Sequence, residues 1–119
     1  MNAKLIAKLL GLSIILIGIG GVILGEKSLL GILNIDFEED LFHLASGSLL
    51  LAVGLRASNK TAGLTLGVLG AIYLIIGLLS FVVPGLFSFL EHGYSVVDNL
   101  IHVSLGVIGL VAYKLSRDK

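Results

Sequence analysis

The chain has 119 residues, of which 56% are hydrophobic and only 13% charged, and its formal net charge is zero. Because a soluble domain usually carries roughly 25% charged residues, this composition excludes an ordinary soluble fold and indicates an integral membrane protein. The basic residues are too few and too scattered for nucleic-acid binding, and the absence of cysteine excludes disulfide bonds in the external loops.

Four apolar segments follow one another along the chain and predict membrane-spanning helices at about residues 5–25, 40–57, 61–84 and 96–115. A spanning helix needs about 20 mostly apolar residues, and the segments lack the alternation of a strand. The second is the shortest and spans only if its flanking polar residues lie among the headgroups. Lys4 and Lys8 give the first a likeness to a signal peptide, but no cleavage motif follows, which favours an uncleaved signal-anchor helix.

The second half of the chain matches the first at an offset of 59 residues, without a gap. A fixed internal period indicates a repeated structural unit. We therefore predict one all-α membrane domain, 1–119, a four-helix bundle built from two tandem helical hairpins, 1–59 and 60–119. Both hairpins enter the membrane with the same polarity, as parallel repeats rather than the inverted repeats of many transporters. The matched pairs include Gly11 with Gly70, Gly18 with Gly77, Leu41 with Leu100, His43 with His102 and Gly47 with Gly106.

The charged residues are sorted between the two ends of this bundle. Seven of the eight basic residues lie in the termini or the central loop, which four spanning helices place on one side: Lys4, Lys8, Arg56, Lys60, Lys114, Arg117 and Lys119. The other two loops hold seven of the eight acids. By the positive-inside rule both termini face the cytoplasm, and we predict a multi-pass protein of the inner (plasma) membrane with acidic outer loops.

Glycines recur every seven residues along the first and third predicted helices. A seven-residue period keeps one face toward a neighbouring helix, and small residues on that face let helix backbones approach closely in a membrane. We therefore predict a helix-packing role, rather than ligand binding, for Gly11, Gly18, Gly25, Gly63, Gly70, Gly77, Gly47 and Gly106.

One polar motif occurs in both halves, at the outer end of the second and fourth predicted helices. Each copy has an acid four residues before a histidine and a glycine four residues after it, which places the three on one helix face. The copies are Glu39, His43 and Gly47, and Asp98, His102 and Gly106. Because glycines mark a face that packs against protein, both histidines are expected to point into the bundle.

Two interpretations of this motif are open. In the structural one, Asp40 and Asn99 are the N-caps of their helices, and each neutral histidine links two helices through a hydrogen bond. In the other, a pseudo-twofold axis brings the two histidines together and creates a site for a divalent metal such as Zn, Mn or Fe. The candidate ligands are His43, His102, Glu39 and Asp98, with His92 and Asp40 as further candidates.

Other chemistries find less support. Haem ligation by the histidine pair is disfavoured because the acidic surroundings would repel the propionates and both histidines lie at one end of the bundle. Proton or ion conduction lacks the ionisable residues that relays need inside the helices. Serines in the apolar helices are expected to bond to their own helix or to bridge helices, so nucleophilic catalysis is not expected.

With these helix starts in view, the chain resembles a family of small bacterial four-helix membrane proteins of unknown function. The likeness rests on Asp40, His43 and Gly47 in the second helix and on Asn99, His102 and Gly106 in the fourth. It implies a four-helix fold in a prokaryotic inner membrane and supplies no activity.

The sequence predicts a non-enzymatic membrane protein, a scaffold or accessory subunit. Its expected partners are the lipid bilayer and either another membrane protein or further copies of itself, and no nucleic acid. The alternative is a metal-binding membrane protein that uses His43 and His102, with no other cofactor expected. A small transporter or channel ranks third, because the helix interiors offer no continuous polar path.

Overall fold

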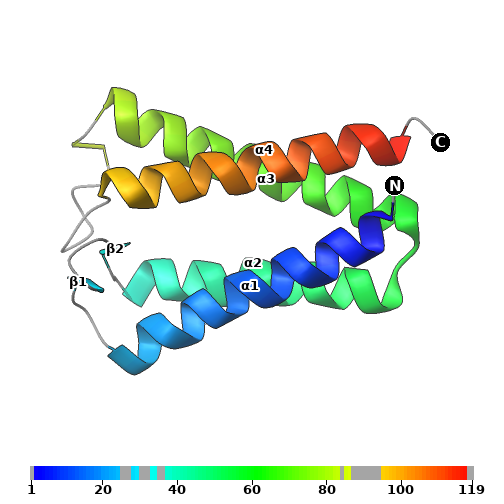
Figure 1. Ribbon diagram of the computed structural model, residues 1–119, viewed down its shortest axis with the longest axis horizontal. Helices are drawn as coiled ribbons and strands as arrows, with labels where there is room; N and C mark the ends of the chain where they lie inside the picture. Colours follow the sequence, from blue (N-terminus) through cyan, green and yellow to red (C-terminus); the bar gives the residue numbers. More distant parts are fainter. Residues whose placement is uncertain are drawn as a thin grey trace.

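The computed structural model describes residues 2–24, 28–29, 33–34, 37–83, 85–86 and 95–117. These residues form the helices α1 (Ala3–Leu24), α2 (Phe37–Arg56), α3 (Asn59–Val82) and α4 (Val96–Arg117), and the short strands β1 (Ser28–Leu29) and β2 (Leu33–Asn34) (Figure 1). The strands pair antiparallel, with Leu29 opposite Leu33. Apart from this minimal pair, the described secondary structure is helical, as the sequence predicts.

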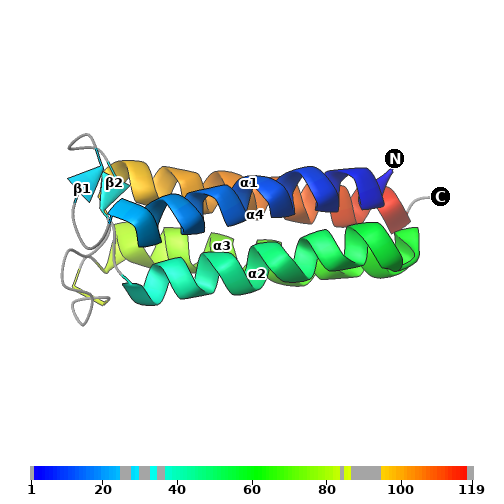
Figure 2. The ribbon, with the colours of Figure 1, turned by 90° about the horizontal axis from the view of Figure 1, so that it is seen from below.

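The helices form two antiparallel hairpins that lie side by side. α1 packs mainly against α2 and α3 against α4, while contacts between the hairpins are sparser. Both chain termini and the short α2–α3 connection lie at one end of the bundle, called here the terminal end; β1 and β2 lie at the other, the loop end (Figures 1 and 2). The longest dimension is 42 Å, comparable with the roughly 40–45 Å of a bilayer with its headgroups.

Three of the described helices are long and apolar enough to cross a membrane, namely α1 over Ala3–Ile23, α3 and α4. α2 is similar in length, at 20 residues, but its first turn holds Glu38, Glu39 and Asp40. Large apolar side chains cover the outside of the bundle, and Ile23 and Val82 are each 77% exposed. An extensive apolar exterior marks a surface that contacts lipid or protein.

Side chains cap the starts of α3 and α4. Ser58 Oγ accepts a hydrogen bond from the Thr61 amide at 3.1 Å. Before α4, Ser95 Oγ accepts a bond from the Asp98 amide at 3.1 Å, and Asp98 Oδ2 accepts one from the Ser95 amide at 2.7 Å. This reciprocal pair is a capping box in which an aspartate replaces the usual glutamate.

The predicted N-caps of α2 and α4 are wrong. Asp40 is the fourth residue of α2 and Asn99 the fourth residue of α4, so both lie within their helices. In α4 the capping box makes Ser95 the N-cap, four residues before Asn99. The residues directly before Phe37 lie outside the described part of the chain.

Glycines bring the two helices of each hairpin into backbone contact. A Cβ atom at Gly11 would lie 2.7 Å from the Gly47 carbonyl oxygen, and a Cβ atom at Gly70 would lie 2.9 Å from the Gly106 carbonyl oxygen. Both separations are too short for a real Cβ, so a larger residue at either position requires the backbones to move apart. The two contacts involve residues that are 59 positions apart.

A second pair of contacts follows the same offset, about two helical turns closer to the loop end. A Cβ atom at Gly18 would lie 2.9 Å from Leu44 Cγ, and one at Gly77 would lie 2.7 Å from Val103 Cγ2. Equivalent residues of the two hairpins thus make equivalent contacts. Gly25, which the sequence also assigns to packing, lies outside the described residues.

Candidate metal centre

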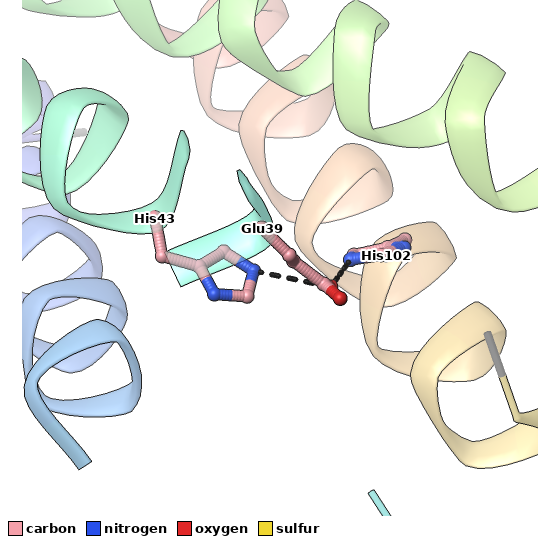
Figure 3. Close-up of side chains that lie close together, drawn as sticks. All are labelled: Glu39, His43 and His102. Atoms are coloured by element: carbon pink, nitrogen blue, oxygen red, sulfur yellow. Dashed lines mark ion pairs between the residues drawn. The ribbon is translucent and has the colours of Figure 1, made fainter. Parts of the chain in front are cut away.

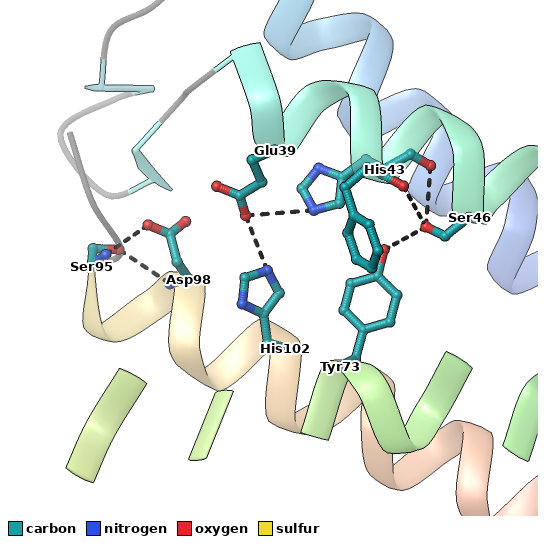
Figure 4. Close-up of polar contacts among 8 residues, drawn as sticks. Glu39, His43, Ser46, Tyr73, Ser95, Asp98 and His102 are labelled. Carbon is teal, nitrogen blue, oxygen red and sulfur yellow. Dashed lines mark hydrogen bonds and ion pairs between the residues drawn. The ribbon is translucent and has the colours of Figure 1, made fainter. Parts of the chain in front are cut away.

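Five buried polar side chains gather toward the loop end of the bundle (Figure 4). Glu39, His43 and Ser46 come from α2, Tyr73 from α3 and His102 from α4. Each is at most 7% exposed. Because α2 belongs to one hairpin and α3 and α4 to the other, this polar cluster joins the two hairpins.

The Glu39 carboxylate lies between the two imidazoles (Figure 3). Its Oε1 is 3.0 Å from His102 Nε2 and 3.6 Å from His43 Nε2. The histidine ring centroids are 6.1 Å apart. One ligand atom from each of the three residues lies within 4.8 Å of the other two. Both imidazoles therefore point into the bundle and approach each other closely, although they come from different hairpins.

Tyr73 extends the cluster from α3, on the side away from the loops (Figure 4). Its Oη lies 2.7 Å from Ser46 Oγ. Ser46 Oγ donates its own hydrogen to the Phe42 carbonyl oxygen at 2.8 Å, so the Tyr73 hydroxyl is the donor in the Tyr73–Ser46 bond. The phenol ring lies 5.7 Å from the His102 ring and 6.4 Å from the His43 ring. Tyr73 thus separates the two histidines from the apolar middle of the bundle.

His43 has poor hydrogen-bond partners for an imidazole that is 7% exposed. Its Nδ1 has no partner among the described residues. Its Nε2 lies 3.6 Å from Glu39 Oε1, beyond the roughly 2.7–3.2 Å of an N–H···O hydrogen bond. Buried polar groups are almost always satisfied, so His43 is a candidate position for a bound water or ion.

The other candidate ligands from the sequence do not join this group among the described residues. Asp98 Oδ2 accepts the hydrogen bond that caps α4, and the three residues whose ligand atoms converge are Glu39, His43 and His102. The Asp40 carboxylate packs directly against Gly21 of α1. His92 lies outside the described residues. The structure therefore assembles one of the three candidate acids, Glu39, with both histidines.

Three of the helix serines behave as expected. Ser13 Oγ donates to the Leu9 carbonyl at 2.8 Å and Ser80 Oγ to the Ile76 carbonyl at 2.7 Å. Ser46 both bonds to its own helix and bridges to α3. Each of these three hydroxyls is thus engaged in a structural bond.

Sequence reasoning missed Tyr73 and its bond to Ser46. The internal repeat could not reveal them, because the residues 59 positions away are the apolar Ile14 and Leu105. The available signal was a single tyrosine in the middle of an otherwise apolar span, since such a hydroxyl needs a partner when it is buried.

Comparisons with protein-family models, with curated proteins and with solved structures find no match. The chemistry of the site is therefore argued from its own side chains. Two imidazole nitrogens and one carboxylate oxygen are a donor set for divalent first-row transition metals, and without thiolates they do not favour copper(I) or iron–sulfur clusters.

Proposed function

We propose that this protein is a small integral membrane protein that binds one divalent transition metal ion through Glu39, His43 and His102. The observation that carries the proposal is the convergence of two imidazoles, one from each hairpin, on a single buried carboxylate. A buried carboxylate is costly unless positive charge compensates it. A divalent cation supplies that charge and also a close partner for His43 Nε2, which lies 3.6 Å from the carboxylate.

The separations of the ligand atoms support a single ion. With metal–ligand bonds of about 2.1 Å, two ligand atoms lie about 3.0 Å apart at a right angle and about 3.4 Å apart at the tetrahedral angle. The observed separations of Glu39 Oε1 are 3.0 Å to His102 Nε2 and 3.6 Å to His43 Nε2. The ligand atoms of the two histidines lie within 4.8 Å of each other, so the imidazoles must move closer together, to about 3.0–3.4 Å, for all three atoms to share one ion.

The donor set favours Zn²⁺ or Fe²⁺. Imidazole suits both, and a carboxylate is a common third ligand for either. Three protein ligands leave coordination positions for water or a further ligand. Haem fits less well, because the Glu39 carboxylate lies between the imidazoles, in the space that a macrocycle would occupy (Figure 3).

We further propose four membrane spans, with both termini in the cytoplasm and the metal at the outer side. The support is that α2 packs along α1, which is apolar enough to span, and that the basic residues gather at the terminal end. The matching contacts at Gly11 and Gly70 and at Gly18 and Gly77 favour an origin by duplication of one hairpin. The polar start of α2 would then lie among the outer headgroups.

A scaffold or accessory subunit is the second candidate function. It is favoured by contacts that join the hairpins without any metal, namely Glu39 to His102 at 3.0 Å and Ser46 to Tyr73 at 2.7 Å. In that case the cluster is a structural link between hairpins, and the acidic outer loops are the surface available to a partner membrane protein or a second copy.

Elemental analysis of protein purified without chelator separates the two candidates. We expect about one metal ion per chain in the native protein, because the three ligands form a single group. We expect none in His43→Ala/His102→Ala. The matched control is Asp98→Asn, which removes an acid at the equivalent position of the other hairpin. A native protein that contains no metal and takes up neither Zn²⁺ nor Co²⁺ would rule out the metal-binding function and favour the scaffold function.

The membrane topology is tested with single cysteines, because the natural chain has none. We expect a membrane-impermeant thiol reagent to label Glu38→Cys in intact cells and Asn2→Cys only after lysis. Both positions are exposed, so access to the reagent differs only through the membrane. Labelling of both positions on the same side would exclude a spanning α1.

A further inference from the structure

A recess at the terminal end of the second hairpin combines positive charge with hydroxyl groups. It lies between the start of α3 and the end of α4 and has a volume of about 720 Å³; its lining is Lys60, Thr61, Leu64, Tyr113, Ser116 and Arg117. Both charged residues of the lining are basic, and none is acidic. The recess therefore suits an anionic ligand.

Glycines on α3 hold the aromatic and hydroxyl residues of α4 in place. A Cβ atom at Gly67 would lie 2.7 Å from Tyr113 Cγ, and Gly63 packs directly against Ser116 Oγ. Tyr113 in turn positions Arg117. Its Oη accepts a hydrogen bond from Arg117 Nη1 at 3.2 Å, and the guanidinium carbon lies 5.5 Å from the ring centroid, within the range of a cation–π contact. Arg117 is thus partly pre-organised at the recess.

The remaining lining residues offer a donor and an apolar wall. Thr61 Oγ1 accepts a hydrogen bond from Ser58 Oγ at 3.0 Å, which leaves the Thr61 hydroxyl hydrogen for a ligand. Leu64, one turn further along α3, is 54% exposed. Polar groups near the helix start followed by an apolar side chain match a ligand with a charged head and a hydrocarbon tail.

We propose that this recess binds the phosphate group of an anionic phospholipid of the cytoplasmic leaflet. The apolar span of α3 begins at Asn59, so the recess lies where headgroups meet acyl chains. Basic pockets between spanning helices on the cytoplasmic side are suited to anionic headgroups, and the planar guanidinium of Arg117 can donate two hydrogen bonds to a phosphate. The proposal rests on the membrane placement proposed above and is independent of the metal.

Native mass spectrometry of the detergent-solubilised chain tests this site, with phosphatidylglycerol as probe and phosphatidylcholine as comparison. We expect Lys60→Gln/Arg117→Gln to weaken phosphatidylglycerol binding about 30-fold, or about fivefold for each basic residue. The matched control is Arg56→Gln/Lys114→Gln, which removes two basic residues near the same end but outside the recess. It should lose far less affinity, because its charges lie outside the binding recess.

Three outcomes would overturn the proposal. An equal loss in both double variants would show that binding depends on overall charge, and equal binding of the two lipids would show no selectivity for an anionic head. Displacement of the lipid by millimolar inorganic phosphate would assign the recess to a soluble anion. Metal content and recovery in the membrane fraction, measured on the same variants, report separately on the metal site and on the membrane placement.

Discussion

The two hairpins pack in the same way but use their polar residues differently. Gly11 contacts Gly47 as Gly70 contacts Gly106, whereas the equivalent acids Glu39 and Asp98 have different partners. Glu39 turns inward to both histidines, while Asp98 accepts the backbone hydrogen bond that caps α4. Aspartate is one methylene shorter than glutamate, which suits a bond to the adjacent helix start. The comparison teaches that two hairpins with equivalent backbone contacts can still give equivalent acids different partners.

The contact between Ser46 and Tyr73 also has no polar counterpart at the equivalent positions of the repeat. Ser46 and Tyr73 form a hydrogen bond, whereas the equivalent positions 59 residues away hold Leu105 and Ile14. Ile14 belongs to the apolar core and Leu105 packs against it. The bundle therefore has a pseudo-symmetric backbone and an asymmetric polar interior. One carboxylate serves two imidazoles, and one tyrosine closes the cluster.

The largest expected effect is the difference in metal affinity between variants of the two equivalent acids, Glu39 and Asp98. Glu39→Gln removes the carboxylate that both histidines share, and we expect metal affinity to fall by at least about 100-fold, more than the loss of an outer-shell partner. Asp98→Asn should leave the affinity unchanged, because its carboxylate caps α4 instead. The measurement is competition with a chromophoric chelator at fixed pH.

Equal losses of affinity in Glu39→Gln and Asp98→Asn would mean that both acids bind the ion. The asymmetric role of Glu39 would then be wrong, and α4 would have to begin differently when metal is bound.

The second-largest expected effect concerns the glycine contacts that both hairpins make. Gly47→Ala and Gly106→Ala place a methyl group 2.8 Å from the Gly11 carbonyl oxygen and 2.7 Å from the Gly70 carbonyl oxygen, respectively. We expect each to lower the free energy of unfolding by about 1–3 kcal/mol, as overpacking does, and by similar amounts because the contacts are equivalent. Equilibrium unfolding in mixed micelles measures both.

Gly20→Ala is the control for the glycine variants, because a Cβ at Gly20 meets nothing within 4 Å. It should be neutral or stabilising by up to about 1 kcal/mol, since alanine favours the helix more than glycine. Destabilisation by Gly47→Ala alone would show that the two hairpins do not pack equivalently.

The smallest expected effect concerns the asymmetric hydrogen bond. A double-mutant cycle of Ser46→Ala and Tyr73→Phe should give a coupling free energy of about 0.6 kcal/mol, the average for polar contacts inside membrane proteins. Ser13→Ala is the control for loss of a hydroxyl that bonds only to its own helix. A coupling free energy of zero would show that the Tyr73–Ser46 bond does not stabilise the docked hairpins.

Much of the fold could be predicted from the sequence, because apolar runs of spanning length permit few structures. The meeting of His43 and His102 was one of two interpretations left open by the repeat, which places them at equal depth on equivalent helices. The different roles of Glu39 and Asp98 were missed, although the spacing of Ser95 and Asp98 is the sequence signature of a capping box and would have assigned Asp98 to the start of α4. Tyr73 was missed because its partner lies 27 residues away on another helix.

The location of the polar cluster has a consequence for the order of assembly. Contacts inside each hairpin connect neighbouring segments of the chain, so each hairpin can form before the two hairpins dock. Glu39 with His102 and Ser46 with Tyr73 cross the boundary between hairpins, so these contacts exist only after docking. A metal ion bound there would slow the separation of the hairpins, and its release would report the first step of disassembly.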